Sequence, residues 1–233
     1  MNRLTLIKSG FLINLVFLVL TGCSATPIAD TDPESASYSQ GDVYLLRGLF
    51  NIFSLGMDEI NESLAAQGFR AGVYSGTSWR SLAGQIADRQ TEIPPESLVV
   101  ISGHSYGADN SIRLARALGE RGVAVDALVL VDPTTPPKIP ANVRRCVNIY
   151  RSQPSTDWMP WLRGVAVEGE DPSTLIINRD LRMSDENADL SDEVNHFNIE
   201  DNPAIQQMVV EEITWIFRQN EIRIAQAKKT GDE

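Results

Sequence analysis

Residues 98–112 read LVVISGHSYGADNSI, and the architecture of the chain can be worked out from this stretch. It begins as a continuous apolar run, which is typical of a central parallel strand. It ends with apolar residues at helical spacing, which predict a helix. Between the two lies a Gly-x-Ser-x-Gly motif at 103–107, whose glycines permit a sharp strand-to-helix turn. Such a turn projects the hydroxyl group of Ser105 above the edge of a sheet, so Ser105 is the candidate nucleophile.

Strand and helix patterns alternate on both sides of this stretch. Strands are expected at 42–48, 69–74, 97–102, 127–131, 145–150 and 174–178, and helices at 61–67, 81–89, 106–121 and from 204 to 217 or beyond. This alternation predicts an α/β fold with a mostly parallel sheet and helices on both faces. The segments between strands are short, so no large cap domain is expected. A chain of 233 residues has room for one such domain, which we place at 42–220.

The chain contains two histidines, of which one is a suitable general base for Ser105. His104 adjoins Ser105, and because neighbouring side chains diverge in a sharp turn, it is expected to line the sheet or the site instead. His196 lies in a polar loop before the final helix, from which an imidazole can reach over the edge of the sheet. By elimination, His196 is the candidate base.

Two aspartates compete for the role of the carboxylate that orients this imidazole. Asp132 directly follows the strand at 127–131, and Asp157 follows the strand at 145–150 after a short loop. Both positions lie at the carboxyl edge of a parallel sheet, where functional residues gather. Position alone does not separate them, since Asp132 precedes a proline and an Asp-Pro turn needs no catalytic explanation.

An oxyanion hole requires two backbone N–H donors. One is expected from Tyr106, the residue after the nucleophile, and the other from the loop after an early strand. In that loop Gly48 allows the backbone to turn, and Leu49, or alternatively Phe50, is expected to be the second donor. The apolar residues at 49–55 could line an acyl pocket or pack on the core.

The motifs resemble those of small bacterial lipase- and thioesterase-like proteins of the α/β-hydrolase superfamily, over about residues 42–218. Such proteins carry a strand running into RGL, a GHS elbow, a DPT segment followed by prolines, and HF-x-I near the end. This chain reads VYLLRGLFNIFS, GHSYG, VDPTTPPKIPANV and NHFNIED. Because the aspartate of DPT recurs in these relatives, the resemblance favours Asp132 over Asp157. The chain departs from many hydrolases in having RG where HG is common before the oxyanion donor.

The resemblance implies a serine hydrolase that cleaves a carboxylic ester or thioester through an acyl-enzyme on Ser105, with no cofactor and no metal. The same triad would also serve an acyltransferase, in which an alcohol or amine replaces water. A hydrolase-like lipoprotein that binds a ligand or an envelope partner without catalysis is a further alternative. The formal net charge of -11 argues against nucleic acid or an anionic membrane surface as the main partner, since both attract basic patches.

The N-terminus reads as a bacterial lipoprotein signal. A basic start and an apolar run at 10–20 precede LTGC, which resembles the lipobox, and the cysteine of that motif is Cys23. We therefore expect a signal peptide at 1–22, lipidation of Cys23 (with palmitate, for example) and a flexible tether at 23–41. The domain would face the periplasm from a membrane of the cell envelope. Ser24 rather than Asp follows the cysteine, which favours the outer membrane.

Three further features complete the reading. Cys146 lies in an apolar strand and is expected to be a small core residue without a disulfide. Residues 153–173 contain two tryptophans and several prolines, and they form either a small lid or ordinary aromatic packing. Residues 221–233 are expected to be a polar tail.

Overall fold

The computed structural model describes residues 25–30, 41–48, 55–155, 158–159, 163–183 and 188–231. In this part of the chain the strands are β1 (Ala29–Asp30), β2 (Gly41–Arg47), β3 (Arg70–Ser75), β4 (Leu98–His104), β5 (Val125–Val131), β6 (Val143–Tyr150) and β7 (Leu175–Asp180). They form one seven-stranded sheet in the order β1-β3-β2-β4-β5-β6-β7. Strands β2 to β7 pair in parallel, and the edge strand β1 pairs antiparallel with β3. The predicted mostly parallel sheet is therefore confirmed.

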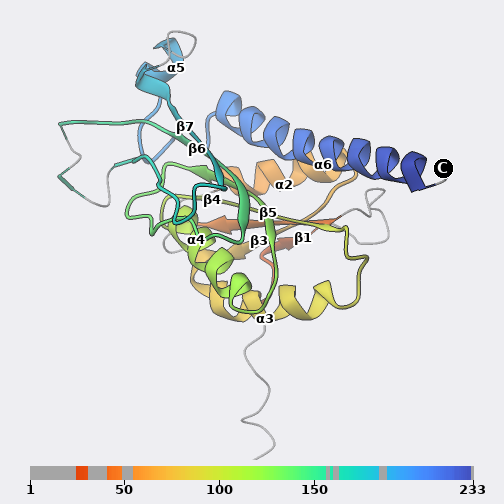
Figure 1. Cartoon of the computed structure of the whole chain (residues 1–233). Helices are drawn as coiled ribbons and strands as arrows, with labels where there is room; N and C mark the ends of the chain where they lie inside the picture. The colour runs from red at the N-terminus through yellow and green to blue at the C-terminus, as the bar shows by residue number, and fades with distance from the viewer. Residues whose placement is uncertain are drawn as a thin grey trace, which may run out of the picture.

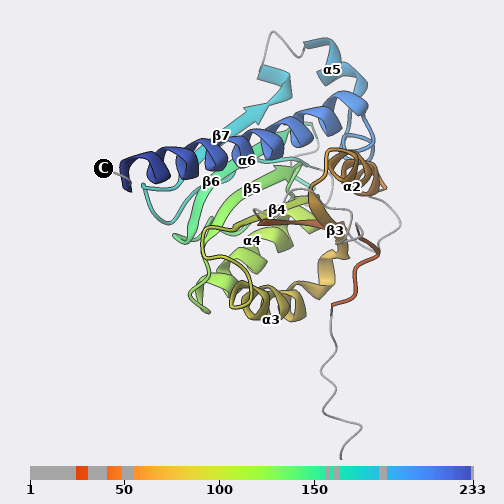
Figure 2. The same cartoon turned by 90° about the vertical axis from the view of Figure 1, so that its right-hand side faces the viewer.

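Helices cover both faces of the sheet (Figures 1 and 2). The described helices are α2 (Gly56–Ala66), α3 (Trp79–Gln90), α4 (Tyr106–Gly119), α5 (Ala188–Glu193) and α6 (Pro203–Gly231), with short 3-10 turns η2 (Gly76–Ser78) and η3 (Leu181–Met183). Helices α2 and α6 pack on one face, and α3 and α4 pack on the other. The described residues contain no large cap domain, as predicted.

Strand β2 shows why the strands read as continuous apolar runs. Val43 and Leu45 point into the core beneath α2 and α6, whereas Tyr44 and Leu46 point into the core on the α3 and α4 side. Successive side chains of a strand face opposite sides of the sheet, so a strand covered on both faces needs apolar residues at every position. Strand β4 lies at the middle of the sheet, so the turn at Ser105 lies above its centre.

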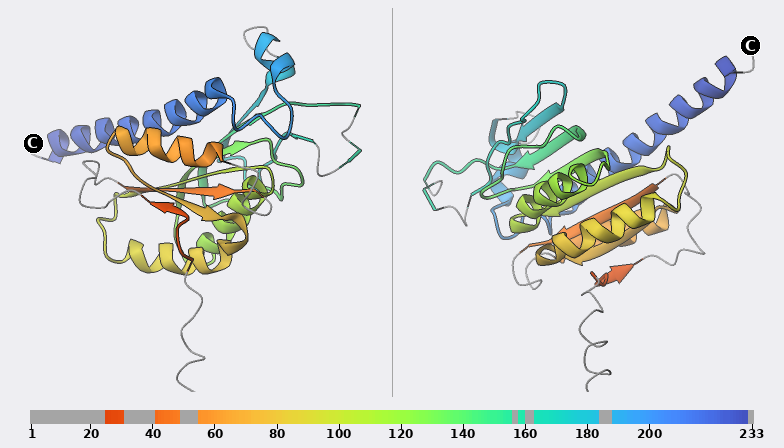
Figure 3. Two further views of the ribbon diagram at one scale, coloured as in Figure 1. Left: turned by 180° about the vertical axis from the view of Figure 1, so that it is seen from behind. Right: turned by 60° about the horizontal axis from the view of Figure 1, so that its bottom comes forward.

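The N-terminal part of the domain begins earlier than the sequence predicts. Ala25 is buried in the core on the α3 and α4 side, and β1 adds a short strand beside β3 (Figure 3). Residues 25–30, which lie within the expected tether at 23–41, contact the domain in this way. Residues 23, 24 and 31–40, including the candidate lipidation site Cys23, lie outside the described residues.

The C-terminal helix α6 extends through most of the segment expected to be a tail. It continues to Gly231, and its final turns project beyond the sheet in Figure 1. Residues 221–231, expected to be a polar tail, are mostly exposed as expected, but they are helical. Within the described ranges, no helix has both the length and the apolar character needed to cross a membrane.

Cys146 lies on β6 and is buried in the core on the α3 and α4 side, as predicted. It is a free cysteine. Burial raises the pKa of its thiol to about 12, so the thiol stays protonated and unreactive at neutral pH.

Candidate active site

The turn between β4 and α4 holds Ser105 in a strained conformation. Its backbone has φ 56° and ψ -124°, a region that residues with side chains rarely adopt. Both flanking glycines are required by packing: a Cβ on Gly103 would lie 2.7 Å from the backbone of Gly107, and one on Gly107 would lie 2.3 Å from the carbonyl oxygen of Leu46. The backbone N–H of Ser105 donates to the carbonyl of Val131 at 2.9 Å, which ties the turn to β5.

The structure brings together three of the residues that the sequence singles out. The Ser105 Oγ lies 2.9 Å from Nε2 of His196, and Nδ1 of His196 lies 2.6 Å from Oδ2 of Asp132. The buried carboxylate of Asp132 can only accept, so Nδ1 carries the ring proton of a neutral His196. The lone pair on Nε2 is then directed at the hydroxyl group of Ser105, which is the arrangement that a general base requires.

The carboxylate of Asp132 is held on several sides. Its Oδ1 accepts a hydrogen bond from the backbone N–H of Arg151 at 3.0 Å, and a Cβ on Gly164 would lie 1.7 Å from the same oxygen. Among the described residues, Ser105 and Asp132 are the non-glycine residues with positive φ, at 56° and 51°. Both strained positions therefore belong to this cluster. The competing aspartate, Asp157, lies outside the described residues.

A buried carboxylate that sequence reasoning missed supports the loop after Asp132. Asp109, in the first turn of α4, is fully buried. It accepts hydrogen bonds from the backbone N–H groups of Thr134 and Thr135 at 3.1 and 3.0 Å, and from their hydroxyl groups at 2.9 and 3.0 Å. Asp109 thus fixes the Asp-Pro-Thr-Thr loop to the helix that begins at the nucleophile.

His104 lies against the loop that carries His196. Its Nε2 lies 3.2 Å from the backbone carbonyl oxygen of His196, and its Nδ1 lies 3.8 Å from Oε1 of Glu200. Burial, aided by the nearby His196, lowers the pKa of His104 to about 3. Burial and the negative charge of Asp201 raise the pKa of Glu200 to about 8. This position of His104 agrees with the sequence expectation that it lines the sheet or the site. Nothing in the sequence predicted that Glu200 would be buried beside it.

Tyr106, one of the two expected oxyanion donors, lies at the start of α4. Tyr106 is the first residue of α4, where backbone N–H groups have no partner within the helix and favour negative charge. Leu49 and Phe50 lie outside the described residues, as do residues 51–54 of the expected acyl pocket.

The segment at 153–173 is described in part. Trp158 is 74% exposed, so it is not packed in the core. The second half of the segment lies beside the sheet: Val165 donates to the carbonyl of Pro133 at 3.1 Å and accepts from the side chain of Asn148 at 2.9 Å. In the ranges that the structure describes, no group of three His, Cys, Asp or Glu side chains is placed to hold a metal ion.

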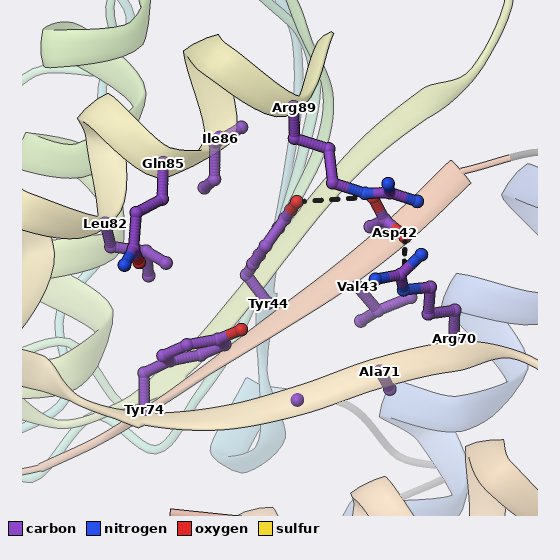
Figure 4. A pocket seen from close by; sticks show the side chains of 11 residues that line it. Asp42, Val43, Tyr44, Arg70, Ala71, Tyr74, Leu82, Gln85, Ile86 and Arg89 are labelled. Atoms are coloured by element: carbon purple, nitrogen blue, oxygen red, sulfur yellow. Dashed lines mark hydrogen bonds and ion pairs between the residues drawn. The ribbon is translucent and has the colours of Figure 1, made fainter. Parts of the chain in front are cut away.

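A charged cavity of about 110 Å³ lies between β2, β3 and α3 (Figure 4). Its centre is Asp42, whose two carboxylate oxygens contact Nε of Arg70 at 3.3 Å and Nε of Arg89 at 2.8 Å. Asp42 and Arg70 stand at the amino ends of their strands, whereas Ser105 follows the carboxyl end of β4. The cavity is therefore at the opposite edge of the sheet from the Ser105 cluster.

Neither a protein-family model nor a curated protein matches the chain. Among solved structures, a protein of the alpha/beta hydrolase superfamily from Xanthomonas campestris pv. campestris is 16% identical, over 75% of this chain and 98% of its own, with a TM-score of 0.42. An esterase domain from Rhodothermus marinus is 12% identical, over 78% of this chain and 88% of its own, with a TM-score of 0.45. A thioesterase domain from the nocardicin cluster is 15% identical, over 70% of this chain and 93% of its own, with a TM-score of 0.41.

The parallel sheet, its helices on both faces and the strand–turn–helix at Ser105 define the chain as a protein with an α/β-hydrolase-like fold, as the sequence predicts.

Proposed function

We propose that the chain is a serine hydrolase that cleaves a carboxylic ester or thioester. The observation that carries the proposal is the continuous contact from Ser105 to His196 to Asp132, at 2.9 and 2.6 Å. Those residues come from three separate parts of the chain. A strained serine at a helix N-terminus, in contact with an imidazole that a buried carboxylate orients, is the constellation of nucleophilic acyl transfer.

In the first half of the proposed reaction, Ser105 attacks the substrate carbonyl while His196 takes its proton. The resulting imidazolium is stabilised by the carboxylate of Asp132. The oxyanion is received by the backbone N–H of Tyr106 and by a second donor, Leu49 or alternatively Phe50. His196 then protonates the leaving alcohol or thiol, and an acyl-enzyme remains on Ser105.

In the second half, His196 removes a proton from water, which attacks the acyl-enzyme and releases the carboxylic acid. If an alcohol or amine took the place of water, the same residues would perform acyl transfer. Both reactions use groups that the protein itself supplies.

The test is reactivity of Ser105. We expect a fluorophosphonate probe to label the wild type, and short-chain p-nitrophenyl esters to be hydrolysed. Ser105→Ala should lose both, with a drop in kcat of at least roughly 10³-fold, because the nucleophile is gone. The matched control is Ser63→Ala, at an exposed serine of α2, which should retain probe labelling and ester hydrolysis. Undiminished turnover by Ser105→Ala would show that Ser105 is not the nucleophile. If the protein binds a ligand without catalysis, the probe will not label the wild type.

We also propose that the mature protein is held on a membrane of the bacterial cell envelope, facing the periplasm, by lipid on Cys23. Support comes from the LTGC motif and the apolar run before it. Cells fed an alkynyl fatty acid should label the wild type and not Cys23→Ser, and fractionation should place the wild type in the outer membrane. Equal labelling of Cys23→Ser would exclude this anchor.

A further inference from the structure

The cavity between β2, β3 and α3 has a charged end that the proposed hydrolytic steps do not use. At this end the buried Asp42 contacts two guanidinium groups, those of Arg70 and Arg89. Figure 4 shows both groups beside its carboxylate. Burial of a carboxylate is costly unless it is paired, and one arginine is enough to neutralise one carboxylate. The second arginine therefore calls for an explanation.

The contacts leave positive charge at this end of the cavity. Both arginines approach Asp42 through Nε, at 3.3 Å for Arg70 and 2.8 Å for Arg89. Within the described ranges, no hydrogen bond engages the terminal guanidinium nitrogens of either arginine. Two cations and one anion leave the group with a net positive charge. The exposed Glu92, which follows α3, also acts on Arg89, but solvent screens a charge at an exposed position.

An anion in solvent can reach the two arginines directly. The side chains of Arg70 and Arg89 are 33% and 30% exposed, whereas that of Asp42 is 6% exposed. An incoming anion therefore meets the guanidinium groups rather than the carboxylate. Because Asp42 already holds both groups in place, the anion does not have to order two mobile side chains when it binds.

The rest of the cavity is uncharged and small. The rings of Tyr44 and Tyr74 and the aliphatic side chains of Leu82 and Ile86 line it, together with the amide of Gln85 (Figure 4). Its volume of about 110 Å³ is severalfold larger than the space that one water molecule needs. The cavity thus suits a small ligand with an anionic group at one end and a short uncharged part at the other.

The presence of two arginines favours a phosphate group over a carboxylate. A guanidinium group donates two parallel hydrogen bonds to a carboxylate or a phosphate. One such group already uses both oxygens of a carboxylate. The phosphate group of a monoester has three free oxygens and a charge close to −2 above its second pKa of about 6, so it can accept from both arginines. A phosphodiester has fewer free oxygens and a single charge.

We propose that Arg70 and Arg89 form a binding site for the phosphate group of a phosphomonoester, whose organic part lies against the ring of Tyr44. The site is at the opposite edge of the sheet from Ser105, so it does not depend on the proposed hydrolase function. The phosphomonoester is a small soluble molecule or a lipid headgroup. A headgroup is included because Ala25, two residues after the proposed lipid attachment, packs in the same core cluster as Tyr44.

The test is isothermal titration calorimetry of the full chain in a low-salt buffer at pH 8, with Ser105→Ala as the parent protein so that no ligand is hydrolysed. The titrants are glycerol 3-phosphate, dihexanoyl phosphatidic acid and, as the matched diester, dimethyl phosphate. We expect a monoester to bind about tenfold more tightly than the diester, and to bind less tightly at pH 5.5, where it carries less charge while the arginines stay charged. Tighter binding of phosphatidic acid would identify a lipid headgroup as the ligand, and equal or tighter binding of glycerol 3-phosphate a soluble ester.

Three variants test the residues of the site. Arg70→Gln and Arg89→Gln should each weaken binding of the monoester about tenfold, because each removes one guanidinium group while the remaining arginine keeps Asp42 paired. Gln85→Glu should weaken it roughly threefold or more without touching the ion pairs, since it adds negative charge to the wall of the cavity.

Arg144→Gln is the matched control, since Arg144 also pairs with an aspartate, Asp126, but does not line the cavity. It should bind the monoester as tightly as the parent protein does. Undiminished binding by Arg70→Gln and Arg89→Gln would overturn the inference, as would equal affinity for monoester and diester, or no binding of either monoester at about 10 mM. If the arginine variants do not fold, unchanged binding by Gln85→Glu would overturn it instead.

Discussion

At the scale of single residues, the candidate site depends on two carboxylates that perform different tasks. Asp132 contacts the ring of His196, whereas the carboxylate of Asp109 accepts hydrogen bonds from the loop that carries Asp132. In the sequence, position after a strand leaves Asp132 and Asp157 open, and the resemblance carried by the DPT motif favours Asp132. It does not identify Asp109 or Glu200, because an acid on a helix or in a polar loop reads as a surface residue. Burial of these acids depends on contacts between segments far apart in the chain.

Replacing Asp132 with asparagine should impair the orientation of the base, His196, while leaving the fold intact. The asparagine carbonyl oxygen can still accept from the backbone N–H of Arg151, so the loop should stay in place. The amide can donate to Nδ1 of His196, which favours the wrong tautomer. We expect kcat for p-nitrophenyl esters to fall by roughly 10³- to 10⁴-fold with an unchanged melting temperature. A decrease under tenfold would argue that another acid, such as Asp157, orients His196.

At the scale of elements, the longer strands were predictable from the sequence, whereas the shortest elements were not. The central strands β4 and β5 are buried at nearly every position because both faces of the sheet are covered, and the apolar runs that they contain stand out in the sequence. The two-residue strand β1 is too short to show any periodicity. Helix α5 has six residues and is likewise too short for a helical pattern to appear. The sequence prediction and the structure thus differ at elements that are stabilised by contacts with neighbouring segments and are too short to show a hydrophobic pattern.

The close contact between α4 and β2 leads to a stability prediction. A Cβ on Gly107 would lie 2.3 Å from the carbonyl oxygen of Leu46, and the backbone on either side cannot easily move. Gly107→Ala should lower the free energy of unfolding by roughly 2 kcal/mol or more, as measured by urea denaturation. Gly84→Ala is the matched control, because nothing lies within 4 Å of a Cβ there and the residue is inside α3. It should raise stability by about 0.5–1 kcal/mol. Equal effects of the two changes would contradict the close packing.

At the scale of the whole molecule, the buried Glu200 makes global stability depend on pH. Unfolded glutamate has a pKa of 4.5, and burial raises the pKa of Glu200 to about 8 in the folded protein. Between these values the unfolded chain binds fewer protons, so the free energy of unfolding falls as pH rises. A pKa displacement is worth about 1.4 kcal/mol per unit, so the loss amounts to a few kcal/mol.

The measurement is urea denaturation of the wild type and Glu200→Gln at pH 5 and pH 8.5. Glu200→Gln should gain stability relative to the wild type as pH rises from 5 to 8.5, because its amide binds no proton in either state. A constant difference between the two proteins would show that Glu200 ionises normally in the folded state. His104 acts in the other direction: its lowered pKa costs stability as pH falls from about 6.5 towards 3 in both proteins, so it cancels in the comparison.

If lipid is attached to Cys23 as proposed, burial of Ala25 limits how far the domain can lie from the membrane. Two residues after the proposed lipid attachment the chain is already part of the folded core, and two residues span at most about 7 Å. A hydrolase attached in this way stays on the bilayer surface and diffuses only laterally with its acyl chains. Such a protein would reach only substrates at the membrane surface and not those in distant layers of the envelope.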